Sequence, residues 1–458
     1  MCGIVGVMGS PEAAKDAYLG LYQLQHRGQE SAGASSTDGT NLHLLRGMGY
    51  ASTVLKDRLA ELPGFAAIGH VRYPTEGEST LKNAQPIFLE CKHGPISLVH
   101  NGNLTNAERL KQELTLEGSG FQTSSDSEVI LHLYARSVSL DPLDAIMEAL
   151  RQVEGAYALV ILTKTHLVAA RDPQGFRPLA LGRRTDGAYV VCSETCALDI
   201  LEAEYLRDVE PGEMVVLSES GGFESRPIGP PMPTAQCVFE HVYFARPDSY
   251  VFGQSVHSVR KEMGRNLAKE VRIDADVVVP VPDSGIVAAE GYAKESGIPL
   301  EHGLIRNHHV GRTFIKPDHE IRTDGVRMKL NPVRAVINQR RVVLVDDSLV
   351  RGTTSRKIVQ LVRNAGASEV HLVIASPPTM WPCFMGIATK RRSQLKAATH
   401  SLEEIRAFLE VDTLSYLSHA GMMEAVGTSR NLYCSACFNG QYPISLPPEL
   451  AKHLTLVE

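Results

Sequence analysis

The chain begins Met1-Cys2-Gly3-Ile4-Val5-Gly6. Methionine is removed from nascent chains when a small residue follows it, which would leave Cys2 with both a thiol and a free α-amino group. An α-amine has an ordinary pKa of about 7.7–8.0 and a thiol one of about 8.5, so the amine can act as the base for the thiol. Ile4 and Val5 predict a buried strand that fixes this terminus. The stretch therefore favours an N-terminal nucleophile, although a cysteine at position 2 often has no such role.

Composition limits the class of protein. The chain has 458 residues, 43% hydrophobic and 21% charged, which predicts two or three folded domains. The net charge is −6, so no basic excess indicates a nucleic-acid partner. No apolar run approaches the roughly 18 residues of a membrane span, and the first residues lack the pattern of a signal peptide. Eight cysteines in such a chain favour reduced thiols, catalysis or metal ligation, and we expect a cytoplasmic protein.

The first half, residues 1–235, is predicted to be rich in strands. Four short apolar runs bounded by Gly, Pro, Asn and Asp predict strands: residues 66–68, 96–99, 158–162 and 167–170. A helical pattern follows Asp126, with Ser125 or Asp126 expected near its cap. Two stacked sheets with helices outside fit this order of elements.

Polar, glycine-containing clusters separate these strands. A cysteine that attacks the carboxamide of a free amino acid needs three kinds of partner: a guanidinium for the α-carboxylate, a carboxylate for the α-ammonium, and donors for the oxyanion. Arg72, Asp126 and the pair Asn101-Gly102 can supply them. Taken singly, each is typical of an ordinary turn or a solvated side chain. Their combination with Cys2 favours catalysis.

These motifs, in this order, resemble the class II glutamine amidotransferase domain, whose nucleophile is N-terminal. The resemblance implies an α+β, αββα sandwich over residues 1–235. It also implies that Cys2 forms a glutamyl thioester and releases ammonia. The remaining roles implied are an oxyanion hole from Asn101 and Gly102, and glutamine binding by Arg27, Gly28, Arg72 and Asp126.

The second half contains a strand-to-helix loop suited to phosphate. Residues 342–345 form a β-branched apolar run, Asp346-Asp347 follow, and a polar loop leads to a helical pattern that begins at Arg356. Such a loop presents backbone N–H groups to a phosphate, while adjacent carboxylates suit ribose hydroxyls or Mg²⁺. A solvated turn is the plainer alternative. No Gly-x-x-x-x-Gly-Lys-Ser/Thr motif occurs, so ATP hydrolysis is not implied.

This loop resembles the phosphoribosylpyrophosphate (PRPP) signature of type I phosphoribosyltransferases, which implies an α/β domain with a parallel sheet over residues 250–420. Residues 277–285 resemble the pyrophosphate loop of that family. The resemblance implies PRPP binding by Asp283, Ser284, Gly285, Asp346, Asp347, Ser348, Arg351, Gly352, Thr353, Thr354 and Ser355. It implies Mg²⁺ at Ser284, Asp346 and Asp347.

A basic segment, residues 306–317, lies between the two loops. Basic runs are usually solvated, but a pyrophosphate substrate gives these cations a purpose. We expect a lid between Gly311 and Pro317 that brings Arg312 and Lys316 to PRPP. Both halves together resemble the glutamine PRPP amidotransferases. Members of that family often have Lys-Asn-Arg-Tyr where this chain has residues 306–309, Arg-Asn-His-His, so no role of that lysine or tyrosine is transferred.

Four of the cysteines suit a metal site. Cys434 and Cys437 form a C-x-x-C pair, and Cys237 and Cys383 stand far upstream. Four thiolates can hold zinc or a [4Fe–4S] cluster, and spacing does not separate the two. Resemblance to one branch of the glutamine PRPP amidotransferases implies the cluster, which would tie a tail of residues 421–458 to the domain junction. Cys91, Cys192 and Cys196 are interpreted as ordinary thiols.

Both halves, together with residues 240–249 at their junction, resemble the glutamine PRPP amidotransferases. The resemblance implies that ammonia displaces pyrophosphate from PRPP to give 5-phosphoribosylamine, the first step of purine synthesis. It further implies a homotetramer inhibited by purine nucleotides, and we expect an enclosed path for ammonia. Cluster-bearing members commonly start with a propeptide, whereas only Met1 precedes Cys2 here. Either removal of Met1 alone matures the enzyme, or a propeptide has been left off the sequence.

Two other functions compete with this interpretation. Another class II amidotransferase would share the glutaminase motifs, but its second domain would lack the loop of residues 345–355. A non-catalytic PRPP-binding regulator would keep that loop, but the intact glutaminase motifs argue against it.

Overall fold

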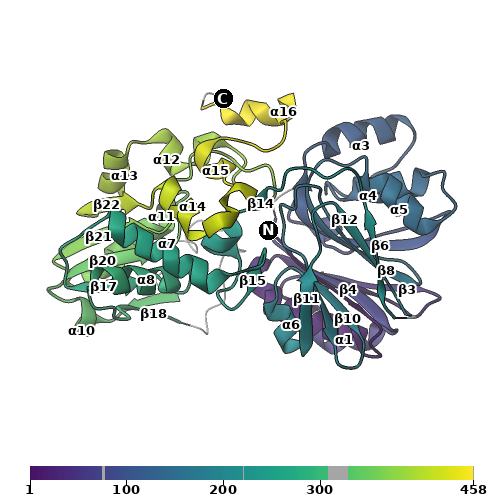
Figure 1. Ribbon diagram of the computed structural model, residues 1–458, viewed down its shortest axis with the longest axis horizontal. Helices are drawn as coiled ribbons and strands as arrows, with labels where there is room; N and C mark the ends of the chain where they lie inside the picture. The colour runs from purple at the N-terminus through teal and green to yellow at the C-terminus, as the bar shows by residue number, and fades with distance from the viewer. Residues whose placement is uncertain (75–77, 220, 308–328, 457–458) are drawn as a thin grey trace.

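The computed structural model describes residues 1–74, 78–219, 221–307 and 329–456. Figure 1 shows two halves side by side, with the N-terminus between them and the C-terminal segment above. None of the helices in the described ranges is both long and apolar enough to cross a bilayer.

The N-terminal half contains two antiparallel sheets. The first has seven strands in the order β11 (Ala203–Asp208), β9 (Ala180–Arg184), β10 (Tyr189–Cys192), β1 (Gly3–Met8), β4 (Ala66–Arg72), β2 (Ser31–Thr37) and β3 (Leu42–Met48). The second has six, in the order β13 (Phe223–Pro227), β12 (Glu213–Ser218), β8 (His166–Arg171), β7 (Gly155–Leu162), β6 (Gly94–Leu104) and β5 (Ile87–Cys91). All four predicted strands are present within β4, β6, β7 and β8.

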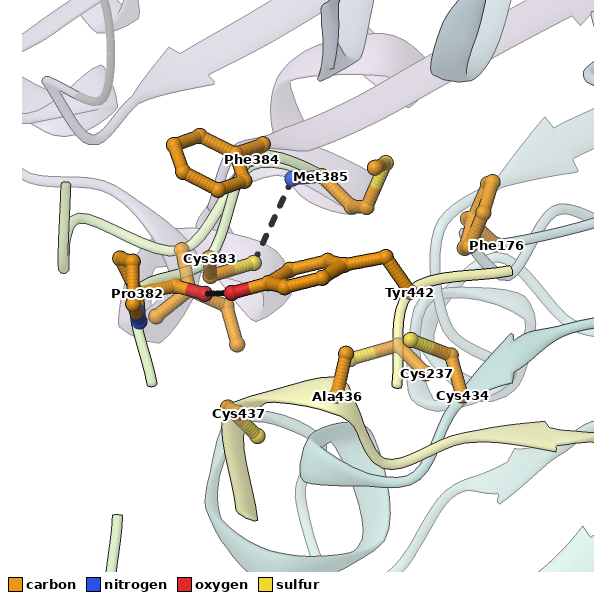
Figure 2. A pocket seen from close by; sticks show the side chains of 11 residues that line it. Phe176, Cys237, Pro382, Cys383, Phe384, Met385, Cys434, Ala436, Cys437 and Tyr442 are labelled. Carbon is orange, nitrogen blue, oxygen red and sulfur yellow. Dashed lines mark hydrogen bonds between the residues drawn. The ribbon is translucent and has the colours of Figure 1, made fainter. Parts of the chain in front are cut away.

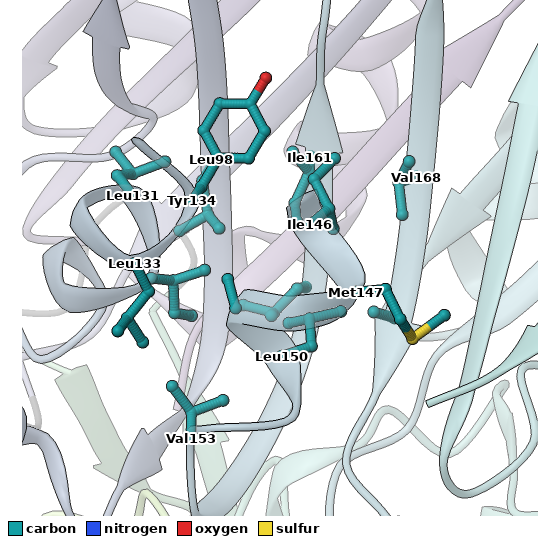
Figure 3. Close-up of a cluster of buried hydrophobic side chains, with 14 of the residues drawn as sticks. Leu98, Leu131, Leu133, Tyr134, Ile146, Met147, Leu150, Val153, Ile161 and Val168 are labelled. Atoms are coloured by element: carbon teal, nitrogen blue, oxygen red, sulfur yellow. The ribbon is translucent and has the colours of Figure 1, made fainter. Parts of the chain in front are cut away.

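Helices cover the outer face of each sheet. The first sheet packs against α1 (Ala13–Gln23), α2 (Ala51–Val54) and α6 (Cys196–Ile200). The second packs against α3 (Ala107–Leu116), α4 (Glu128–Arg136) and α5 (Pro142–Leu150), and Figure 3 shows apolar side chains of α4 and α5 against strands of that sheet. A separate apolar core fills the space between the sheets. These four layers confirm the predicted αββα sandwich.

Strand β1 lies in the middle of its sheet, between β10 and β4. Its side chains alternate: Ile4 and Met8 enter the core between the sheets, whereas Val5 and Val7 face helix α1. Every residue of β1 is buried. The predicted strand therefore exists, and it holds Cys2 at a fixed place.

Helix α4 begins later than the sequence indicated. Its N-cap is Ser127, which makes no side-chain cap bond. Asp126 is not the cap, because one of its carboxylate oxygens accepts the N–H of Leu104 at 2.8 Å instead. The Asp126 carboxylate thus satisfies the backbone N–H of Leu104, the last residue of strand β6.

The C-terminal half is built on a parallel sheet with the order β17 (Val277–Pro280), β20 (Arg341–Asp346), β21 (Glu369–Ile374) and β22 (Thr413–Tyr416). Apolar cores lie on both faces, as expected for parallel strands. Among the described residues, this half contains the helices α7 (Val256–Glu270), α8 (Ile286–Ser296), α10 (Arg334–Ile337), α11 (Thr353–Asn364), α12 (Lys396–Thr399), α13 (Leu402–Leu409) and α14 (His419–Ala425). Helix α11 begins three residues before the predicted pattern.

Short elements join the halves. The connector between them contains β14 (Gln236–Cys237), a π-helical turn η4 (Glu240–Phe244), and the ribbon of β15 (Tyr250–Val251) with β16 (Gln254–Ser255). Strand β14 pairs in parallel with β23 (Tyr433–Cys434) of the tail, which continues through α15 (Ala436–Asn439) and α16 (Pro448–Ala451). A further ribbon pairs β18 (Leu304–Arg306) with β19 (Leu330–Pro332). The tail thus returns to the junction of the halves.

Candidate active sites and the cysteine cavity

Cys2 is held on two sides by hydrogen bonds. Its backbone N–H donates to Oδ1 of Asn101 at 3.0 Å, and its carbonyl accepts from Nε of Arg27 at 2.9 Å. Its Sγ lies 3.6 Å from the carbonyl oxygen of Tyr73. These contacts come from β6, the 3₁₀ turn η1 (Leu24–Arg27) and the end of β4. The predicted nucleophile is therefore fixed at a point where three elements meet.

The side-chain amide nitrogen of Asn101 has no hydrogen-bond partner in the described structure. The Oδ1 of the same residue accepts from Cys2, whereas Nδ2 is buried. A buried donor without a partner costs about 1–3 kcal/mol, and such groups in native proteins commonly have a functional cause. This donor, beside the thiol-bearing residue, is suited to an oxyanion.

Gly102 follows Asn101 in a space that excludes any larger residue. A Cβ here would lie 2.0 Å from the carbonyl oxygen of Ala156 and 2.5 Å from Nε2 of His100. The glycine thus lets strands β6 and β7 approach closely beside the oxyanion donor.

Arg72, at the end of β4, is buried and paired. Its Nη1 lies 2.8 Å from both carboxylate oxygens of Glu30, which is also buried. Glu30 fixes the direction of the guanidinium that we predicted would bind the α-carboxylate. Sequence analysis missed Glu30, because an isolated glutamate before a strand carries no signal.

Asp126 belongs to a polar cluster behind the oxyanion donor. Its Oδ1 accepts from the hydroxyl of Ser127 at 3.2 Å, and the same hydroxyl lies 2.8 Å from Nδ1 of His100. Burial lowers the pKa of His100, so this ring is neutral at physiological pH. Ser127 and His100 thus orient the carboxylate, and the structure adds both to the site.

Arg27 occupies the centre of a buried charge network. Its Nη1 and Nη2 donate to the two carboxylate oxygens of Glu240 at 3.0 and 2.9 Å, and Nη1 also contacts Glu194. All three side chains are fully buried. Burial opposes a charge on Arg27, but Glu240 and Glu194 outweigh it and raise its pKa. We predicted that Arg27 lines the site, and in this structure it grips the backbone of Cys2.

Gly28 also lies at this point. A Cβ on it would be 2.5 Å from the backbone carbon of Arg72, so only glycine allows η1 to approach β4 so closely.

The predicted PRPP loops lie at neighbouring strand ends. Strands β17 and β20 are adjacent and parallel, so the segments that follow them leave the same edge of the sheet. The hydroxyl of Ser284, after β17, contacts the carboxylate of Asp347, after β20. The two segments recognised separately in the sequence thus form one surface.

Asp346 and Asp347 are both buried. Burial raises the pKa of each, and the neighbouring carboxylate adds to the effect on Asp346. Arg260 of α7, itself buried, partly offsets this at Asp347. Two adjacent carboxylates at a strand end, hard to ionise alone, have the oxygen chemistry that Mg²⁺ requires.

The rest of the loop leads into α11. Ser348 donates to Asp347 at 2.5 Å, and Gly352, with a φ of 74°, is the N-cap of the helix without a side-chain cap bond. Thr353 and Thr354 are exposed and Ser355 is buried. The first N–H groups of α11 are thus open to an anion.

The basic segment is described only at its start. Arg306 forms an ion pair with Asp283 of the predicted pyrophosphate loop, and Arg351 donates to Gln394 at 3.1 Å. Arg312, Lys316 and the limits proposed for the lid, Gly311 and Pro317, lie outside the described residues.

Cys237, Cys383, Cys434 and Cys437 line one small cavity. Figure 2 shows Cys434 and Cys437 on the tail, with Cys237 of the connector and Cys383 of a third segment around the same space. Burial raises the pKa of Cys237 to about 11 and of Cys434 to about 12. The other cysteines are elsewhere: Cys192 and Cys196 are buried beside the first sheet and Cys91 is half-buried.

The segment around Cys383 contacts the N-terminal half directly. The carbonyl of Phe384 accepts from Nδ2 of Asn103 at 3.0 Å, and the carbonyl of Met385 accepts from Nε of Arg177 at 2.9 Å. The cavity therefore borders the end of strand β6, which carries Asn101 and Gly102.

Known proteins match the chain along nearly its whole length. Residues 72–199 match the family described as "Glutamine amidotransferase domain", and residues 256–376 match "Phosphoribosyl transferase domain". Amidophosphoribosyltransferase of Bacillus subtilis (strain 168) is 49% identical over 97% of this chain and 94% of its own. Amidophosphoribosyltransferase 1, chloroplastic, of Arabidopsis thaliana is 49% identical over 97% of this chain and 78% of its own.

Two solved structures are similar throughout. The glutamine PRPP amidotransferase from B. subtilis, complexed with ADP and GMP, has a TM-score of 0.91 at 48% identity and covers 98% of each chain. A structure described as the allosteric regulatory enzyme of purine biosynthesis has a TM-score of 0.92 at 48% identity and covers 100% of each chain.

Fold and site thus define a two-part enzyme, a glutaminase with an N-terminal nucleophile joined to a phosphoribosyltransferase. The chain belongs to the amidophosphoribosyltransferase family. Its substrates are glutamine and PRPP: ammonia from glutamine displaces pyrophosphate from PRPP and gives 5-phosphoribosylamine in purine biosynthesis.

Proposed function

We propose that Cys2, freed of Met1, attacks the glutamine carboxamide and forms a glutamyl thioester. The observation that carries this assignment is the unpaired Nδ2 of Asn101 beside Cys2. Nδ2 and the amide of Gly102 stabilise the oxyanion, Arg72 binds the α-carboxylate and Asp126 the α-ammonium. Arg27 and Gly28 complete the site. The freed α-amine of Cys2 takes the thiol proton and returns it to the leaving ammonia.

Maturation has a structural constraint. Met1 is buried, with 1% of its surface exposed, and its sulfur contacts Arg177. A buried terminus is poorly accessible to an aminopeptidase, so we expect any removal of Met1 to precede folding. Mass spectrometry of the purified protein tests whether Cys2 is exposed: a mature enzyme starts at Cys2, and a fully active protein that retains Met1 would contradict the proposal.

In the second domain, proposed to span residues 250–420, Asp346 and Asp347 hold the ribose hydroxyls and residues 348–355 hold the 5′-phosphate. Asp283, Ser284 and Gly285 face the pyrophosphate. The carboxylates and the Ser284 hydroxyl offer oxygen ligands for Mg²⁺, which would neutralise charge on the departing pyrophosphate. Arg312 and Lys316 would add positive charge from the lid.

The assay for this function is direct. The purified protein is incubated with glutamine, PRPP and MgCl₂, and glutamate and pyrophosphate are measured. We expect equal amounts of both and dependence of pyrophosphate release on Mg²⁺. Release of glutamate without pyrophosphate at saturating PRPP would overturn the assignment of the second site.

We infer that the four cysteines of the cavity hold a [4Fe–4S] cluster, as the resemblance to one branch of the family implies. The gathering of four thiols around one cavity supports this proposal, because four thiolates are the usual ligands of such a cluster. Visible absorbance and iron and zinc analysis test this, and stoichiometric zinc without iron would contradict it.

Three further properties are proposed from the family. The protein with ADP and GMP bound supports inhibition of this chain by purine nucleotides. A homotetramer and a cytoplasmic location follow from the resemblance alone, and sedimentation tests the oligomeric state.

We also propose that ammonia passes between the sites without entering solvent. An ammonia trap in the buffer that captures all the ammonia made from glutamine at saturating PRPP would contradict the enclosed path.

A further inference from the structure

The connector between the halves contributes a charged side chain to the environment of the nucleophile. Glu240 lies in η4, outside the motifs that define the glutaminase site, and is fully buried. Buried carboxylates are rare unless they are paired, and Glu240 has two partners. It forms a two-pronged pair with Arg27, and its Oε1 lies 3.5 Å from Nη1 of Arg177.

The two arginines lead in opposite directions. Arg27 uses its remaining Nε to hold the carbonyl of Cys2 at 2.9 Å. Arg177 holds the carbonyl of Met385, in the segment that follows Cys383. One carboxylate therefore sits between the backbone of the nucleophile and a segment of the other half.

The geometry of Arg27 requires this carboxylate. A guanidinium is planar, so the two bonds to Glu240 fix the plane in which Nε–H points, and that direction meets the Cys2 carbonyl. Glu194 contacts only Nη1, and a single contact leaves the guanidinium free to rotate about it. Mature Cys2 has no residue before it, so its carbonyl is one of the few points by which it can be held.

We propose that Glu240 is a positioning residue of the glutaminase reaction, which acts by orienting Arg27 on the carbonyl of Cys2. The proposal rests on the assignment of Cys2 as the nucleophile. Glu240 does not touch glutamine in this account. Its loss changes the placement of the thiol, and misplacement by about 1 Å can lower a rate about 100-fold. The phosphoribosyltransferase site, which does not use Arg27, is unaffected.

The test variant is Glu240→Gln, which keeps the shape and removes the charge. We expect kcat with glutamine to fall by about 10-fold to 100-fold, with KM for glutamine within threefold, because Arg72 and Asp126 are intact. Activity with ammonium chloride should stay within twofold of wild type, which also shows that the variant folds. Alkylation of Cys2 by iodoacetamide, followed by mass spectrometry of the N-terminal peptide, should slow in parallel with kcat.

Asp248→Asn is the matched control. Asp248 belongs to the same connector and is exposed; it forms an ion pair with the half-buried Arg246, and no hydrogen bond or ion pair joins either side chain to Arg27 in the described structure. This variant should keep wild-type kcat and alkylation rate. Arg27→Lys alone and combined with Glu240→Gln completes the cycle. If Glu240 acts through Arg27, the double variant is no slower than Arg27→Lys within twofold.

The outcomes separate the two proposals. Wild-type kcat and alkylation rate in Glu240→Gln overturn the positioning role and leave the assignment of Cys2 untouched. The same holds if KM rises while kcat is unchanged, or if ammonia-dependent activity falls in parallel with glutamine-dependent activity, since both indicate a merely structural role. If Cys2→Ser keeps glutamine-dependent activity, the assignment of the nucleophile itself fails.

Discussion

In the proposed glutaminase site, Asn101 uses both the oxygen and the nitrogen of its carboxamide. Its Oδ1 holds Cys2 and its Nδ2 is the unpaired donor. Asn101→Asp keeps the acceptor but replaces the donor with an oxygen that repels an oxyanion. Loss of one such donor lowers kcat about 10²-fold to 10³-fold, and we expect that loss with glutamine. Pyrophosphate release with ammonium chloride should stay at the wild-type rate, and a wild-type rate with glutamine would contradict the role of Asn101.

We expect the ionised carboxylate of Asp346 to lower the stability of the folded protein, although PRPP turnover requires it. Burial and Asp347 raise its pKa, so the folded protein holds this proton more tightly than the unfolded chain. Stability from this group is complete below the ordinary carboxyl pKa of 3.8 and is lost as the pH rises through the folded pKa. Asp346→Asn should therefore raise Tm in metal-free buffer by a few degrees, increasingly so from pH 4 upward, while PRPP turnover is lost.

Asp276 provides a control, because its pKa is shifted in the opposite direction from that of Asp346. It lies at the other end of the sheet and pairs with Arg341, which helps to lower its pKa to about 2. Asp276→Asn should lower Tm slightly or leave it unchanged, and should not alter KM for PRPP. A lower Tm in Asp346→Asn at neutral pH would contradict the account of the buried pair.

Individual residues could be predicted from the sequence where they belong to motifs. Residues that orient those motif residues through tertiary contacts were missed. Cys2, Asn101 and Asp126 stand in recognisable strings, and the structure places Asn101 within hydrogen-bond distance of Cys2. Glu30 stands in none of these strings, and Glu240 begins the recognised junction of residues 240–249 but received no role there, because both act through contacts across strands or between halves. A solitary glutamate in the sequence has no feature that indicates whether it will be buried against an arginine.

Among the helices and strands, α11 begins at a position whose backbone conformation requires glycine. Gly352 is its N-cap with a φ of 74°, a conformation costly for any residue with a Cβ. A Cβ there would also lie 3.3 Å from the ring of Phe408. Gly352→Ala should cost about 1 kcal/mol in unfolding free energy, displace the first turn of the helix and raise KM for PRPP at least fivefold.

Gly297 allows a matched control. It ends helix α8 with a φ of 77°, and a Cβ would meet nothing within 4 Å. Gly297→Ala should lower Tm by a similar amount with KM for PRPP unchanged. Equal KM values in the two variants would show that the loop before α11 does not hold the phosphate.

Strand positions were predicted better than helix starts. The apolar runs of β4, β6, β7 and β20 are unambiguous, and the αββα sandwich and the parallel sheet are confirmed. The first turn of α11 is Thr353-Thr354-Ser355, whose polarity hides it from a pattern of apolar residues. Asp126 has the character of a helix cap, but its carboxylate accepts from a strand, which only the tertiary structure reveals.

At the scale of the whole molecule, the cysteine cavity should fasten the tail to the junction. In addition to the short pairing of β14 with β23, the proposed cluster would link the connector, the Cys383 segment and the tail. Because metal binding stabilises the folded state only, Cys437→Ser should lose iron, lower Tm by several degrees and make the tail sensitive to protease.

Cys91→Ser is the control, since Cys91 lies outside the cavity. It should keep its iron, Tm and protease resistance. Full iron content in Cys437→Ser would contradict the assignment of the four ligands.

The sequence indicated two catalytic halves but not how they meet. Motifs within each half are local, whereas the contact of Phe384 with Asn103 joins residues 281 positions apart. The burial of Glu240 against Arg27 likewise depends on the docking of the connector. Such contacts depend on the shape of both surfaces, and no short stretch of the chain encodes them.

The central claim is that Cys2 releases ammonia from glutamine and that the loop after β20 binds the PRPP with which this ammonia reacts. Pyrophosphate release by Cys2→Ser, measured with glutamine and separately with ammonium chloride, tests it most directly. The account predicts that release with glutamine is lost while release with ammonium chloride stays within twofold of wild type. Retained activity with glutamine, or loss of activity with both, would contradict it.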